Sequence, residues 1–191
     1  MRLPRIILAR HGKPLWDSMT PIPGSALAEW VAGIDTAPID PTYRPPAALE
    51  RLARNSPAIA ASPLRRSLES AALLAPGTAP LVDPLFREVW LPTAFNTKLR
   101  LPPKVWAVVA RSAWYSGWSP HVESFPEARR RAATAATLLA RLASVHGQVL
   151  LAGHGLMNGL IGKRLRRFGW HGPRLRPRRY WAYCVYDRPD E

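Results

Sequence analysis

Short, continuous apolar runs recur along this chain, and each ends at a polar or glycine-containing segment. Such runs are typical of strands that are buried on both faces of a sheet. The expected strands are residues 5–9, 58–61, 81–82, 148–152 and 180–186.

Segments with helical spacing lie between these strands. The expected helices are residues 25–31, 46–55, 63–74, 102–115, 124–146 and 155–168, and residues 33–46 are expected to be extended. Ser62 before Pro63 is a helix-opening signal, Ser124 opens the longest helix, and Gly147 is its expected cap. The alternation predicts an α/β fold: a three-layer αβα sandwich with a mostly parallel sheet.

The length of 191 residues suits a single domain over residues 1–191. Four of the eight tryptophans fall within residues 87–121: Trp90, Trp106, Trp114 and Trp118. Residues 90–118 are therefore expected either to cap a binding site or to pack in the core.

Two of the expected strands end in histidines that are flanked by glycine. Arg10-His11-Gly12 follows the first strand, and His154 stands between Gly153 and Gly155 after a later one. Ligands of open α/β sheets bind outside the carboxyl ends of strands. A guanidinium beside two imidazoles at that edge predicts a site for an anion.

The net charge of +14 and the pI near 11.3 fit attraction to anionic substrates or polyanions. A general compositional bias toward arginine would explain the same charge. The single cysteine, Cys184, cannot form an internal disulfide and is expected to be a buried thiol. No apolar run is long enough to span a bilayer and no secretory signal is evident, so we expect a cytoplasmic protein.

Several motifs occur together in one order. After Arg-His-Gly come residues 33–39, then Ser62-Pro63-Leu64-Arg65-Arg66-Ser67-Leu68-Glu69-Ser70-Ala71, then Glu123-Ser124 with Arg131, and finally residues 150–155. This set, over about residues 5 to 160, resembles the histidine phosphatase superfamily, the phosphoglycerate-mutase-like proteins. The resemblance also implies that fold.

The resemblance implies a phosphatase that needs neither metal nor cofactor: a phosphoric monoester hydrolase of the histidine acid type. It assigns the phosphohistidine to His11, and catalytic roles to His154 and to Glu88 as general acid. Arg10, Arg66, Gly12 and Asp17 are the expected substrate-binding residues. Two arginine forks suit the oxygens of a transferring phosphoryl group. The implied partner is a small phosphorylated substrate.

The chain departs from the family pattern at three places. Asp17 stands where many members have an asparagine that would donate to phosphate, so either Lys13 offsets its charge or Asp17 points away. Glu69-Ser70 replaces Gln-Thr, and residues 89–92 replace a glycine-rich segment that usually follows the acid.

Two other functions fit the sequence. One is a phosphotransferase of the phosphoglycerate mutase type, which the chain's shortness disfavours. The other is a non-catalytic protein that binds nucleic acid or anionic lipid through residues 163–167 and the arginines Arg174, Arg176, Arg178 and Arg179.

The remaining histidines and two acids are expected to be ordinary. His121 and His171 lie in loops, and His146 is expected to interact with a helix dipole. Asp35 and Asp40 are expected to form turns.

Overall fold

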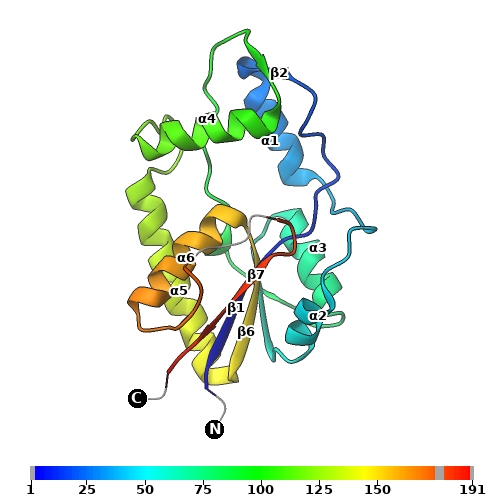
Figure 1. The fold of residues 1–191 in the computed structure, drawn as a ribbon, viewed down its shortest axis with the longest axis vertical. Helices are drawn as coiled ribbons and strands as arrows, with labels where there is room; N and C mark the ends of the chain where they lie inside the picture. The colour runs from blue at the N-terminus through cyan, green and yellow to red at the C-terminus, as the bar shows by residue number, and fades with distance from the viewer. Residues whose placement is uncertain (1–2, 175–178, 190–191) are drawn as a thin grey trace.

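The central sheet has five strands in the order β4-β3-β6-β1-β7 (Figure 1). The structure is a computed structural model that describes residues 3–174 and 179–189. The strands are β1 (Arg5–Arg10), β3 (Ala58–Ala61), β4 (Leu81–Val82), β6 (Gln148–Gly153) and β7 (Tyr183–Asp187). All neighbours pair in parallel except β7, which runs antiparallel to β1 at the edge. The mostly parallel sheet predicted from the apolar runs is confirmed.

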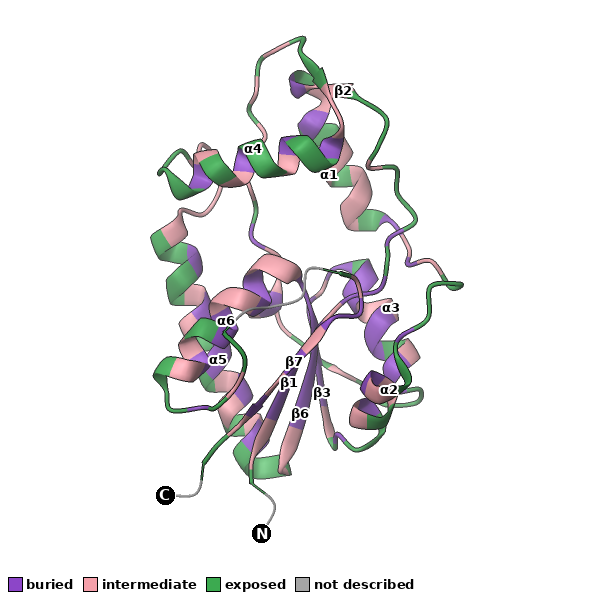
Figure 2. Ribbon diagram, viewed as in Figure 1, coloured by how far each residue is buried: buried purple, intermediate pink, exposed green. Residues whose placement is uncertain are grey.

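Helices cover both faces of this sheet. One face carries α2 (Ala47–Arg54) and α3 (Arg65–Leu74), and the other carries α5 (Phe125–His146) and α6 (Gly155–Arg167) (Figure 1). Side chains alternate across a strand, so Ile6 and Leu8 pack toward α5 and α6, whereas Ile7 and Ala9 pack toward α2 and α3. Burial on both faces, visible in Figure 2, explains why the inner residues of β1, β3 and β6 are apolar.

The longest helix, α5, begins and ends where the sequence predicts. Ser124 and Glu127 form a capping box, in which the serine oxygen accepts from the Glu127 amide and the glutamate accepts from the Ser124 amide. At the other end, Gly147 has a φ of 75°, a left-handed conformation that favours glycine. His146 lies in the last turn, as expected.

One prediction was wrong for residues 33–36. They belong to α1 (Leu27–Thr36), which follows a single 3-10 turn, η1 (Gly24–Ala26). Trp16 packs so closely on Gly33 that a Cβ there would collide with the indole ring. This contact comes from a distant loop, so local composition could not reveal it.

A second group of elements stands above the carboxyl ends of the parallel strands. It contains α1, α4 (Pro103–Tyr115) and a short antiparallel pair that the sequence did not predict, β2 (Ile22–Pro23) and β5 (Arg100–Leu101) (Figure 1). The chain enters this group first through β2 and α1, and again through β5 and α4 after a 3-10 turn, η2 (Pro84–Phe86). The position of α4 suits the expected cap.

The four tryptophans of the segment divide between packing and surface. Trp106 and Trp114 are buried, and their indole N–H groups donate to the carbonyls of Ile22 and Glu123. Trp90 and Trp118 are exposed. Packing in the core is confirmed for Trp106 and Trp114, whereas a cap over a binding site stays a prediction for this segment. Among the described residues, no helix is long and apolar enough to cross a membrane.

Candidate active site

The pairing of β1 with β6 brings the two strand-end histidines together. Arg10 lies opposite Gly153 in the register, and the His11 amide donates to the Gly153 carbonyl at 2.9 Å. The rings of His11 and His154 meet edge to face, with centroids 5.1 Å apart. Both side chains are buried, so the two imidazoles form one protected site.

The His11 ring is held in a single tautomer. Its Nδ1 lies 2.7 Å from the Gly12 carbonyl oxygen. A carbonyl can only accept, so Nδ1 must carry the proton, and the neutral ring presents a lone pair at Nε2. Among the described residues, none forms a hydrogen bond with Nε2. This nitrogen is therefore free to act as a nucleophile.

Two serine hydroxyls hold the second imidazole. His154 Nε2 lies 2.8 Å from Ser62 Oγ and 3.1 Å from Ser67 Oγ. Its Nδ1 is buried and has no hydrogen-bond partner in the described chain. Ser62 also accepts a hydrogen bond from the Leu64 amide. It is not the N-cap of α3, because that position is occupied by Leu64. The serine predicted to open this helix thus positions a site histidine instead.

Burial keeps both histidines neutral. It lowers the pKa of His11 well below the usual 6.5, and the positive charges of Arg66 and Arg10 lower it further. Burial also lowers the pKa of His154, with additional lowering from His11, Arg66, Arg10 and Arg131. The site is therefore a cationic pocket that contains two uncharged imidazoles.

Arg66 is buried and points to the same pocket from α3. Its Nη1 donates to Asp35 Oδ1 at 2.9 Å and to the Ile34 carbonyl at 3.0 Å. Neither contact uses Nε or Nη2. Asp35 was expected to form a turn, and that prediction was wrong: it lies in α1 and pairs with this arginine.

Tyr180 is a site residue that the sequence did not reveal. Its ring lies 4.4 Å from the guanidinium carbon of Arg10 and 5.7 Å from the His11 ring centroid. Burial lowers the pKa of Arg10 while Tyr180 and Glu88 raise it, and the guanidinium remains charged at neutral pH. Arg66 and Arg111 of α4 lower it, so α4 lies within electrostatic range of the site.

Gly12 makes two contacts, and the second of them requires glycine. Its amide donates to Ser70 Oγ at 2.9 Å, and a Cβ at this position would lie 2.6 Å from a ring carbon of Trp181. Ser70, part of the Glu69-Ser70 departure, therefore supports the loop that carries His11. Trp181 has a left-handed φ of 59°, which is unusual for a bulky residue and marks the close fit beneath the site.

Glu88 lies at the amino terminus of α6. Its carboxylate accepts from the amides of Met157 at 2.9 Å and Leu156 at 3.2 Å, and also from Val89. A carboxylate is stabilised at a helix amino terminus by unpaired amides and the helix dipole. Glu88 therefore stabilises the amino terminus of α6, and it does so within electrostatic range of Arg10.

Asp17 does not face these residues through its carboxylate. It is exposed and accepts hydrogen bonds from the Thr20 hydroxyl and from the amides of Met19 and Thr20. These hydrogen bonds, with that of the hydroxyl contributing most, hold its pKa below the usual value. Lys13 pairs with Asp40 at 3.6 Å. Of the two expectations for Asp17, the geometry favours the one in which it points away. Asp40 also accepts from Thr42, as expected of a turn former.

The remaining predicted residues lie elsewhere. Cys184 is buried in β7, as expected. Of the basic segment, Lys163 and Arg167 are exposed on α6 and Arg174 and Arg179 are exposed in the following loop, whereas Arg176 and Arg178 lie outside the described residues. Within the described residues, no group of three or more histidine, cysteine or acidic side chains could hold a metal ion.

The model of the histidine phosphatase superfamily (branch 1) matches residues 6–188 of this chain. A search of curated proteins finds no match. Among solved structures, Bacillus stearothermophilus YhfR is similar, with 18% identity, a TM-score of 0.56, and coverage of 85% of this chain and 80% of that chain.

Two phosphatases have the same fold. One is a mycobacterial glucosyl-3-phosphoglycerate phosphatase, with 21% identity, a TM-score of 0.52, and coverage of 84% of this chain and 78% of the other. The other is a phosphoserine phosphatase from Entamoeba histolytica, solved in complex with phosphoserine, with 15% identity, a TM-score of 0.56, and coverage of 85% and 80%. These likenesses confirm the predicted fold.

The buried histidines predict a pH dependence of folding stability. Their pKa values are lower in the folded than in the unfolded chain, so the unfolded chain binds more protons below pH 6.5. The free energy of unfolding should fall as pH decreases below 6.5, by up to about 1.4 kcal/mol per pH unit for each histidine.

Urea unfolding at pH 7.0, 6.0 and 5.5 measures this effect. The double variant His11→Gln/His154→Gln should lose most of the slope, because its side chains do not titrate. An unchanged slope in that variant would show that other groups cause the dependence.

Proposed function

Because this chain belongs to the histidine phosphatase superfamily, we propose that it hydrolyses phosphate monoesters through a phosphohistidine intermediate on His11. The observation that carries the proposal is the fixed tautomer of His11, whose Nε2 lone pair opens into a pocket flanked by Arg10, Arg66 and His154. A neutral imidazole with one nitrogen engaged and the other free is the form that a nucleophile requires.

In the first step, His11 Nε2 attacks phosphorus while the bond from phosphorus to the ester oxygen breaks. Arg10 and the unused nitrogens of Arg66 bind the phosphoryl oxygens and offset their charge. His154 donates from Nδ1, which requires its Nε2 to accept from the hydroxyls of Ser62 and Ser67. Water then attacks phosphohistidine, releasing inorganic phosphate and restoring His11.

The leaving oxygen needs a proton, and Glu88 is the candidate donor. In the first step Glu88 gives its proton to the leaving oxygen. In the second step its carboxylate, which the amides of Leu156 and Met157 hold in place, takes a proton from the attacking water. Glu88 is therefore protonated again at the end of each cycle.

Assignment to the histidine acid phosphatase type is a finer part of the same proposal. It rests on the neutral histidines, which remain unprotonated into the acidic range, and on a second histidine as a donor.

Replacement of His11 by alanine should abolish turnover, since it removes the nitrogen that attacks phosphorus. Brief incubation with phosphate-labelled substrate should leave label on His11 of the native protein, stable to base and lost in acid. His146→Ala, at the exposed end of α5, is the matched control and should retain full activity. Full activity of His11→Ala, or label on another residue, would refute the mechanism.

Replacement of Glu88 by glutamine should slow alkyl phosphates by roughly 10²–10⁴-fold and p-nitrophenyl phosphate much less, because only a poor leaving group needs a proton. The measurement is kcat for a series of esters with different leaving groups. A uniform loss of kcat across the series, together with a lower melting temperature, would show that Glu88 only stabilises the amino terminus of α6 and is not the general acid.

Phosphatase and mutase activities differ in the group that attacks phosphohistidine: water in a phosphatase, and a substrate hydroxyl in a mutase. We expect steady release of inorganic phosphate from simple monoesters without a bisphosphate primer, and negligible interconversion of 2- and 3-phosphoglycerate. Both rates can be measured on the same preparation. Interconversion much faster than phosphate release would establish the mutase alternative.

A further inference from the structure

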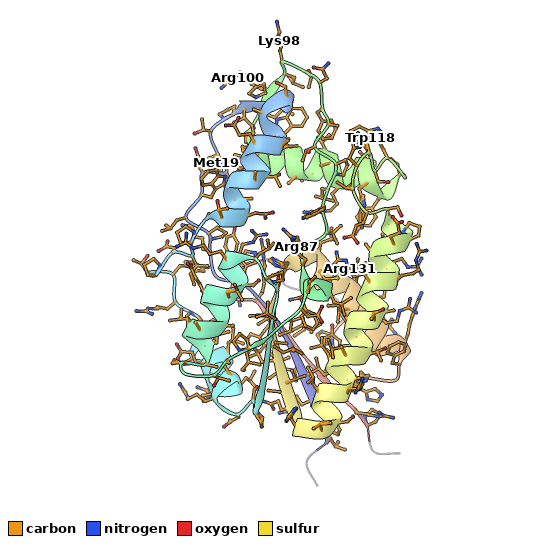
Figure 3. All side chains as sticks on the ribbon, turned by 180° about the vertical axis from the view of Figure 1, so that it is seen from behind. Met19, Arg87, Lys98, Arg100, Trp118 and Arg131 are labelled. Carbon is orange, nitrogen blue, oxygen red and sulfur yellow. The ribbon has the colours of Figure 1, made fainter. Side chains whose placement is uncertain are left out.

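An open cavity of about 550 Å³ adjoins the candidate active site through Glu88. It lies where η2 and the following loop meet α5, and Figure 3 shows Arg87 and Arg131 there, seen from behind. Glu88 lines the cavity and also lies close enough to Arg10 to raise its pKa. If Glu88 protonates the leaving oxygen, the rest of the leaving group must extend beyond it, and this cavity is the space available.

Most charged groups that line the cavity are already engaged. Arg131 pairs with Glu123 through two nitrogens and also donates to the carbonyls of Leu85 and Arg87. The carboxylate of Glu127 caps α5. These contacts leave neither an unpaired acid nor an unpaired base among these residues.

Arg87 is different. Its guanidinium carbon lies 4.8 Å from the ring centroid of Trp90, and its buried Nε has no hydrogen-bond partner. Within the described residues, no carboxylate pairs with it. A half-buried cation without an acidic partner is unfavourable, and an anion that reaches the terminal nitrogens of Arg87 from the cavity would offset its charge. The Trp90 ring holds the guanidinium in place by a cation–π contact.

The lining of the cavity has a second unusual feature. His121 lines the same cavity in a left-handed conformation, with a φ of 59°. Strained backbone of this kind occurs preferentially at binding sites. It places another nitrogen-bearing ring at the cavity that contains Arg87.

From these observations, we propose that the cavity is a specificity subsite in which Arg87 binds a second anionic group of the leaving group. The preferred substrates would then be phosphate monoesters whose alcohol portion carries a carboxylate or another phosphate. Trp90 and Val122 would contact the intervening carbon atoms. This inference rests on the proposed phosphatase function and adds the class of substrate.

Two substrates separate the subsite from the reacting centre. 4-Carboxyphenyl phosphate and 4-carbamoylphenyl phosphate have nearly the same size and similar leaving groups, but only the first carries a second charge. We expect the native protein to hydrolyse the carboxylate with at least about tenfold higher kcat/KM, since only this ester can form a hydrogen bond between two charged groups with Arg87.

Arg87→Gln should remove this preference. It should lower kcat/KM for the carboxylate by about 10- to 100-fold and change that for the carbamoyl ester by less than about twofold. Arg130→Gln, which replaces a mostly exposed arginine of α5, is the control and should keep the preference.

The outcomes distinguish the two proposals. If the native protein hydrolyses neither ester, the proposed function fails. If it hydrolyses both at equal kcat/KM, or if Arg87→Gln slows both equally, the phosphatase function stands and the subsite is refuted. The comparison in the native protein decides the question even if the Arg87 variant does not fold.

Discussion

The parallel pairing of β1 with β6 is the constraint on which the site depends. The register places Arg10 beside Gly153, so His11 and His154 leave the sheet together at its carboxyl edge. The amide of His11 remains tied to Gly153, and the Gly12 carbonyl fixes the proton on Nδ1. A shift of one residue in this register would turn every side chain of β1 to the other face and separate the histidines. The core and the chemistry are thus specified by the same ladder of hydrogen bonds.

The positive charge of the pocket is partly offset by groups from distant parts of the chain. Burial and two arginines keep the histidines neutral, whereas Asp35 and Glu88 supply negative charge at the edges and Tyr180 offers the face of its ring to Arg10. A buried arginine without such neighbours would be costly. The pocket therefore remains cationic enough to attract a phosphate dianion but is partly compensated before one binds.

Several residues serve local structure and the candidate site at once. Ser62 supports the turn before α3 and holds His154, Ser70 joins α3 to the Gly12 amide, and Glu88 occupies the amino terminus of α6. Each uses a short side chain or a carboxylate to satisfy backbone donors that would otherwise be unpaired. The geometry of the pocket therefore depends on the same contacts as the fold. For variants at these positions, stability must be measured together with kinetics to separate the two effects.

The sequence by itself determined the strands of the main sheet, the helices that flank it and the two histidines at its edge. Burial on both faces leaves continuous apolar runs, and strand ends collect ligand-binding residues. The sequence also located both ends of α5, since capping chemistry is local. Only the tertiary structure decided that residues 33–36 are helical, that Asp35 pairs with Arg66, and that Tyr180 and Trp181 lie against Arg10 and Gly12. These contacts join segments 31 to 170 residues apart, and packing between distant segments leaves no periodic signal in either one.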